Sequence, residues 1–71
     1  MRIKLLSHGG YRGLMLCRFP LEISGDIDVY DDGCDVQYHV MESIDGFLLC
    51  RGDAFEGDSY FFYPYEFEVI E

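Results

Sequence analysis

Hydrophobic and polar residues alternate with a period of two through much of this chain, the pattern of half-buried β-strands. The clearest case is the closing segment 59–71, where rings occupy odd positions and carboxylates occupy even positions from Glu66. Proline lacks a backbone N–H, so Pro64 predicts a kink within this strand. The face that closes the fold is expected to carry these odd positions: Phe61, Tyr63, Phe67 and Val69.

Shorter alternating or apolar stretches predict the remaining strands, at residues 2–6, 21–24, 27–29, 36–40 and 47–51. Asp31-Asp32-Gly33 predicts a hairpin turn, because Asp and Gly tolerate turn geometry. Gly25-Asp26 predicts a bulge or a tight hairpin. Apolar residues never recur at helical spacing over ten or more positions, so little or no helix is expected.

Together these elements predict an all-β fold with five to six antiparallel strands and turn signals about every ten residues. A chain of 71 residues makes one domain, here residues 1–71. Aromatic strands with open edges invite association. We therefore expect the sheet to close into a small barrel.

The segment Tyr63-Pro64-Tyr65-Glu66-Phe67-Glu68-Val69-Ile70 resembles the end of SH3-like barrels. In that family an aromatic–Pro pair begins a single 3₁₀ turn, and an apolar strand ends the domain. The resemblance implies an SH3-like small barrel. The chain lacks the acidic loop and paired tryptophan of peptide-binding SH3 domains, so recognition of proline-rich ligands is not implied.

The opening stretches Lys4-Leu5-Leu6-Ser7-His8-Gly9-Gly10-Tyr11-Arg12-Gly13-Leu14 and Phe19-Pro20-Leu21-Glu22-Ile23 look like those of a group of short bacteriophage proteins. Members begin with a basic strand, a Gly-Gly-Tyr-x-Gly loop and a Phe-Pro-hydrophobic-Glu strand, and they end in an aromatic, acidic strand. The resemblance implies a phage accessory protein in the cytoplasm of a bacterial host. It implies no particular activity.

Charge is the strongest feature of the composition, with fourteen acidic and five basic residues and a net charge of −9. Residues 1–18 contain four of the basic residues and no acidic one, whereas every carboxylate lies later in the chain. A strongly acidic domain is repelled by nucleic acid and by anionic membranes, and is attracted to basic protein surfaces. The other interpretation is that acidity only keeps the domain soluble.

Cofactor, metal and catalytic motifs are not found, and we expect no cofactor, no specific metal site and no enzymatic activity. Cys17, Cys34 and Cys50 match no zinc spacing and are expected to be reduced thiols. The acidic stretch 26–35 fails as an EF-hand, because Tyr30 and His39 fall where oxygen ligands are needed. A Cys–His pair without an oxyanion motif or a third supporting group makes a poor nucleophile site.

We also expect no membrane partner. The longest apolar run, Gly13–Cys17, is far shorter than the roughly 20 residues that cross a bilayer. The start of the chain lacks a signal-peptide pattern. Both features favour the cytoplasm.

Small barrels often bind nucleic acid by stacking nucleobases on aromatic residues above a basic groove. This chain has too few lysine and arginine residues to form such a groove. We therefore expect the inverse, a domain that presents carboxylates to a protein that normally holds DNA or RNA. Outward carboxylates two residues apart on a strand are about 6.6–6.8 Å apart, similar to successive phosphates on a DNA strand. Two rows are expected, one of Glu22, Asp26 and Asp28 and one of Glu66 and Glu68, with the other carboxylates in loops. The candidate contact residues are Glu22, Asp26, Asp28, Asp31, Asp32, Asp35, Asp53, Glu56, Asp58, Glu66 and Glu68.

The sequence thus predicts a non-catalytic phage protein that binds a host protein with a basic surface and inhibits it by nucleic-acid mimicry. The alternative is a structural or interaction module that self-associates, for example as a homodimer, through its aromatic strand. In the first case binding weakens with salt, whereas in the second the acidity serves only solubility.

Overall fold

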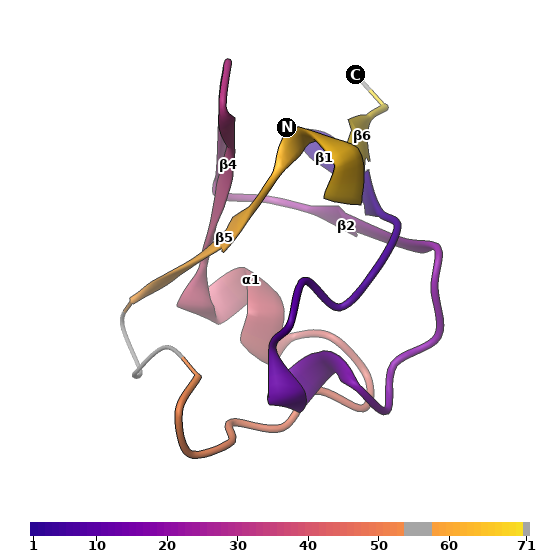
Figure 1. Cartoon of the computed structure of the whole chain (residues 1–71), viewed down its shortest axis with the longest axis vertical. Helices are drawn as coiled ribbons and strands as arrows, with labels where there is room; N and C mark the ends of the chain where they lie inside the picture. Colours follow the sequence, from indigo (N-terminus) through magenta and orange to yellow (C-terminus); the bar gives the residue numbers. More distant parts are fainter. Residues whose placement is uncertain (54–57, 71) are drawn as a thin grey trace.

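The computed structural model describes residues 1–53 and 58–70, which form two small antiparallel sheets (Figure 1). Sheet A has the strand order β2-β1-β6, and sheet B has the order β3-β4-β5. The strands are β1 (Arg2–Leu5), β2 (Leu21–Ser24), β3 (Ile27–Tyr30), β4 (Gly33–Gln37), β5 (Ser59–Phe62) and β6 (Phe67–Val69). The prediction of a mostly β fold with five to six antiparallel strands is confirmed.

A corner at Gly25 joins the two sheets. The Gly25 N–H donates to the Met1 carbonyl at 3.2 Å and extends the ladder of sheet A. One residue later the Asp26 carbonyl accepts from the Gln37 N–H at 3.2 Å, which extends sheet B. The φ angle of Gly25 is +130°, a backbone conformation that residues with a side chain rarely adopt. Glycine therefore makes this corner possible. The corner replaces the predicted bulge or hairpin.

The predicted closed barrel is wrong, because strand pairing in the described part of the chain stays within each sheet. A 3₁₀ turn, η2 (Pro64–Glu66), separates β5 from β6 and sends them to different sheets. Proline fits the first position of such a turn because no partner is needed for its missing N–H. The kink predicted at Pro64 is therefore present, as a turn between two strands.

A short helix, α1 (Tyr38–Glu42), occupies the second half of the strand predicted at residues 36–40. Its buried residues Val40 and Met41, followed by buried Ile44, have helical spacing, so the helix packs against the core with one face. The strand predicted at residues 47–51 is also wrong, because residues 47–50 have no regular secondary structure.

The aromatic closing segment has the opposite phase to the one predicted for its first half. Tyr60 and Phe62 on β5 are fully buried, opposite buried Val36 and Cys34 on β4. After η2 the phase changes, and Phe67 is buried on β6. Of the four predicted inward residues only Phe67 is buried; Phe61 is half-buried, and Tyr63 and Val69 are exposed.

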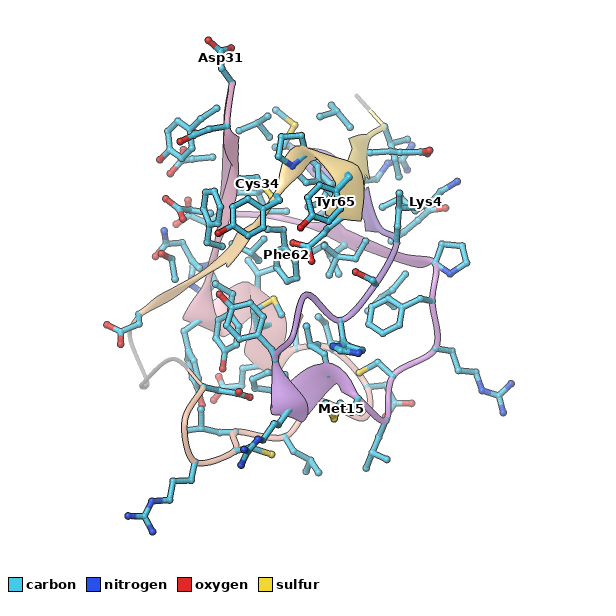
Figure 2. The ribbon with its side chains drawn as sticks, in the orientation of Figure 1. Lys4, Met15, Asp31, Cys34, Phe62 and Tyr65 are labelled. Atoms are coloured by element: carbon cyan, nitrogen blue, oxygen red, sulfur yellow. The ribbon has the colours of Figure 1, made fainter. Side chains whose placement is uncertain are left out.

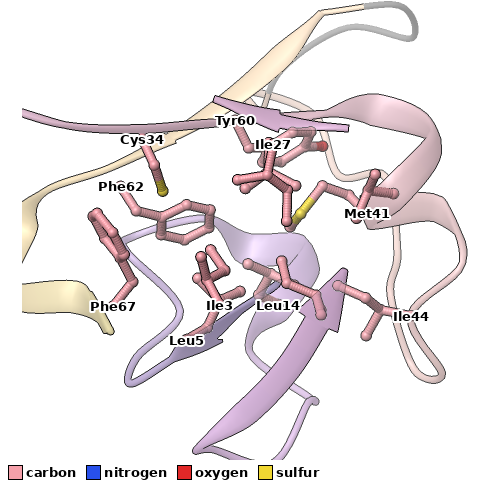
Figure 3. Close-up of a cluster of buried hydrophobic side chains, with 13 residues drawn as sticks. Ile3, Leu5, Leu14, Ile27, Cys34, Met41, Ile44, Tyr60, Phe62 and Phe67 are labelled. Atoms are coloured by element: carbon pink, nitrogen blue, oxygen red, sulfur yellow. The ribbon is translucent and has the colours of Figure 1, made fainter. Parts of the chain in front are cut away.

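One hydrophobic core lies between the sheets and α1, as Figure 3 shows. It collects aliphatic residues of β1 and β2, two rings of β5 and the buried residues of α1. The loop after β1 covers one side of it: Tyr11 packs against Tyr60 with ring centroids 4.6 Å apart. Within the described residues the Tyr60 hydroxyl is buried without a hydrogen-bond partner, and burial raises the pKa of Tyr60 to about 12.

Candidate protein-interaction surface

The outward side of sheet B brings acidic and aromatic side chains together. Asp28 on β3 lies directly opposite Asp35 on β4, and Asp35 lies opposite Phe61 on β5. The hydrogen bond between Gln37 and Asp26 fixes the phase of the β3–β4 ladder, and two residues further along Asp28 and Asp35 form the next hydrogen-bonded pair. The Cα atoms of such a pair are about 5.5 Å apart, so the two carboxylates are close neighbours.

Like charges directly opposite one another on a sheet destabilise it. Asp28 is exposed and Asp35 is half-buried, so water screens only part of their repulsion. No basic residue lies on β3, β4 or β5 to offset it. The pair is therefore a local cost to the fold and an attractive position for a cation from another molecule.

A row of rings runs beside this carboxylate pair. The Phe61 ring lies over Gly33, since a Cβ atom on Gly33 would collide with the ring. Phe61 contacts Tyr63 edge to face with centroids 5.1 Å apart, and Tyr63 stacks on Tyr65 at 5.8 Å with the planes 4° apart. Tyr63 is 53% exposed and Tyr65 76% exposed, so these rings present apolar area and π faces to the surroundings.

Tyr30 and the hairpin turn complete the surface. Tyr30, at the end of β3, is half-exposed. Its pKa is raised by partial desolvation, and next by the negative charges of Asp28 and Asp35. Asp31 and Asp32 form the hairpin turn, and Asp31 projects at the end of the molecule opposite Met15 (Figure 2). We call this surface the acidic aromatic face: Asp28, Tyr30, Asp31, Asp32, Asp35, Phe61, Tyr63 and Tyr65.

The two carboxylate rows expected along single strands are not formed. Glu22 lies on β2 and Asp28 on β3, with the corner at Gly25 between them, and Asp26 lies in that corner. Glu66 lies in η2, half-buried, and its Oε1 accepts from the Tyr63 N–H at 2.9 Å. Asp58 is exposed just before β5, and Glu56 lies outside the described residues.

Lys4 divides the acids of sheet A. It lies opposite Glu22 on β2 and opposite Glu68 on β6, so one cation stands between two carboxylates. Opposite charges on facing strands stabilise a sheet by roughly 0.2–1 kcal/mol. This side of the molecule is less negative than sheet B and offers a weaker attraction to a basic partner.

Asp53 has an internal role that the sequence interpretation missed. Its carboxylate accepts from the N–H groups of Arg12 at 3.0 Å and Gly13 at 2.7 Å, at the start of the 3₁₀ turn η1 (Arg12–Leu14). The Leu48 N–H also donates to the Gly13 carbonyl at 3.0 Å. Asp53 therefore ties the loop after β1 to residues 48–53, and its charge is partly used there.

Metal ligands and reactive thiols are the two kinds of chemical site that the sequence raised. In the part of the chain that the structure describes, no group of three His, Cys, Asp or Glu side chains comes close enough to hold a metal ion. Burial raises the pKa of the Cys34 thiol to about 11. The pKa of the Cys17 thiol is also raised, mainly by desolvation and secondly by the negative charge of Asp45. Both thiols are protonated and weakly nucleophilic near neutral pH.

Comparison with known proteins finds no matching family model, no matching curated protein and no matching solved structure. Over residues 1–53 and 58–70, no helix is long and apolar enough to cross a membrane.

Proposed function

We propose that this protein is a non-catalytic binder of a basic protein surface, and that the acidic aromatic face is its contact site. The observation that carries the proposal is the pairing of Asp28 with Asp35 beside the row of rings that begins at half-buried Phe61 and continues to exposed Tyr63. A lysine or arginine placed over this pair relieves the repulsion and gains two charge-assisted hydrogen bonds. The neighbouring rings add cation–π contacts of about 0.5–1 kcal/mol at exposed sites.

The tyrosines support an interface of the protein–protein type. Tyrosine and arginine dominate the binding energy of many interfaces, because they bury large areas and keep a polar end. Tyr30, Tyr63 and Tyr65 are exposed, and the rings of Tyr63 and Tyr65 continue the row that begins at Phe61 opposite Asp35. An arginine-rich partner therefore meets carboxylates and rings, its two preferred contacts. A partner that normally holds DNA or RNA has such a surface, and occupation by carboxylates competes with phosphate.

The proposal includes an origin and a setting. The resemblance of the opening stretches to short bacteriophage proteins supports a phage accessory protein that inhibits a host protein in the bacterial cytoplasm. The 3₁₀ turn at Pro64–Glu66 before the last strand is consistent with the resemblance to SH3-like domains at this position. The SH3-like arrangement remains part of the proposal.

The second candidate is a homodimer, favoured by one observation: the half-buried ring of Phe61 and the exposed rings of Tyr63 and Tyr65 form a continuous row. Packing of two such rows would bury apolar area, and the acidity would then serve only solubility. It would also bring the Asp28–Asp35 pairs of two copies near one another, a repulsion that favours a basic partner over a second copy.

Affinity capture from bacterial lysate tests the proposal with two matched double variants. Asp28→Asn with Asp35→Asn removes the central pair, whereas Glu22→Gln with Glu68→Gln removes the same charge from sheet A. The proposal expects a partner that is released by salt, lost with the first variant and kept with the second. Equal capture by both variants, or a salt-resistant dimer on sizing chromatography, contradicts it.

A further inference from the structure

Strand β2 forms one edge of sheet A, and the hydrogen-bond pattern shows which of its groups face outward. The Gly25 N–H bonds to Met1 across the β1–β2 ladder, so the pairs Ile3–Ile23 and Leu5–Leu21 are the hydrogen-bonded ones. On the other side of β1 the Ile70 N–H bonds to Arg2, in agreement with this alternation.

The N–H and C=O groups of Glu22 and Ser24 therefore point away from β1. They make no hydrogen bond to any other described residue, so the edge carries two unpaired donors and two unpaired acceptors. Unpaired groups along a strand edge are a template for another strand.

A groove of about 330 Å³ runs along this edge. All four residues of β2 form one wall, and the turn at Ser43–Asp45 that follows α1 forms the other. Glu22 and Asp45 supply two exposed carboxylates, while Ile23 and Ile44 supply buried aliphatic side chains. The groove thus combines an open strand edge, negative charge and an apolar floor.

We propose that this groove binds an extended segment of another protein in which lysine or arginine alternates with aliphatic residues, as a fourth antiparallel strand of sheet A. Strand addition of this kind obtains affinity from main-chain hydrogen bonds and specificity from alternate side chains. The basic residue paired with Glu22 has its side chain on the side of that carboxylate. Its aliphatic neighbours point toward Ile23 and Ile44.

Charge complementarity selects this occupant over a second copy of the chain. Two β2 strands paired edge to edge would bring Glu22 of each copy into the same negative groove, where like charges repel. The site is separate from the acidic aromatic face, since it belongs to sheet A, and it stands independently of the proposed function.

Titration with a labelled peptide of alternating Lys and Val tests the proposal. The protein carries Asp28→Asn and Asp35→Asn, so that binding to the acidic aromatic face is suppressed. At saturation we expect hydrogen exchange of the Glu22 and Ser24 amides to slow by about tenfold or more, because each gains an acceptor. Unchanged exchange at both amides overturns the proposal.

Backbone methylation of the peptide provides a test that leaves the protein unaltered. In antiparallel pairing the lysine opposite Glu22 directs its N–H at β2, whereas the valine N–H groups point away. Methylation of the lysine backbone nitrogens should weaken binding about tenfold, and methylation of the valine backbone nitrogens should weaken it far less. Equal loss in both series overturns the proposal.

A matched pair of protein variants tests the role of charge. Glu22→Gln should weaken the Lys–Val peptide about two- to fivefold, the range of an exposed ion pair. Glu68→Gln removes the same charge from the opposite edge strand β6 and should leave affinity unchanged. A larger loss with Glu68→Gln than with Glu22→Gln overturns the proposal.

Discussion

The Tyr11 hydroxyl bonds both main-chain polar groups of Phe61: it accepts from the Phe61 N–H at 2.9 Å and donates to the Phe61 carbonyl at 3.2 Å. β5 is an edge strand of sheet B, and these groups point away from β4. A single side chain thus occupies the place of a neighbouring strand. The edge is closed to strand addition at this point, in contrast with the open edge of β2.

Replacement of Tyr11 by Phe should lower the free energy of unfolding by about 1–3 kcal/mol, because the Phe61 groups lose their partner while the ring stays in place. Urea denaturation measures the change. The control is Tyr65→Phe, whose side chain is 76% exposed and which should shift stability by less than about 0.5 kcal/mol. Equal effects would mean that the hydroxyl does not support the edge.

Neutralisation of Asp28 should stabilise the protein. Asp28→Asn removes the repulsion from Asp35 and should raise the free energy of unfolding by about 0.2–1 kcal/mol at low salt. The gain should shrink as salt screens the pair. Glu68→Gln is the opposite case, because it removes an attraction to Lys4 and should not stabilise. A loss of stability with Asp28→Asn argues against the repulsion inferred for the pair.

The phase of the closing segment can be tested by truncating neighbouring rings. Phe62 is fully buried, and Phe62→Ala should cost about 3–5 kcal/mol or prevent folding. Tyr63 is 53% exposed, and Tyr63→Ala should cost less than about 1 kcal/mol. Thermal denaturation of both variants measures the two losses of stability. If Phe61 and Tyr63 faced inward instead, Tyr63→Ala would cost more than Phe62→Ala.

Stability should fall in alkaline solution because of Cys34. Its pKa is raised from 9.0 to about 11 in the folded protein, so the thiolate forms more readily in the unfolded chain. The contribution is complete below pH 9, and it is lost as pH rises from 9.0 toward 11, by up to about 1.4 kcal/mol per pH unit. Urea denaturation between pH 7 and 10 should show a shallower decline for Cys34→Val. An unchanged slope contradicts this assignment.

The strands at the two ends of the chain and the hairpin at Asp31-Asp32-Gly33 are predictable, because alternation and turn residues act locally. Helix α1 was missed because Val36, Tyr38 and Val40 also alternate, and only packing shows that Val40, Met41 and Ile44 share a helical face. The phase of Phe61 and Phe62 could not be derived, because the turn at Pro64 leaves an even number of residues between the inward positions Phe62 and Phe67, which breaks the period of two.

The acidic character of the candidate site was predictable, but its shape was not. Rows along one strand were expected, whereas the structure pairs Asp28 with Asp35 across two strands. That pairing depends on the register of the hairpin. Asp53 and Glu66 were counted as surface charges, yet both accept main-chain hydrogen bonds, which only the folded chain reveals. The rings of Tyr30, Tyr63 and Tyr65 were not predicted as part of the site either, because only the folded chain shows where they lie.

The most direct measurement is an amide NMR titration of the protein with octa-arginine, a probe that supplies cations without aliphatic side chains. The account predicts that the largest shifts occur on the acidic aromatic face, centred on Asp28, Asp35 and Phe61, and that Asp28→Asn with Asp35→Asn abolishes them. Shifts that spread evenly over all acidic residues, or that concentrate at Glu22 and Glu68 on sheet A, would contradict it.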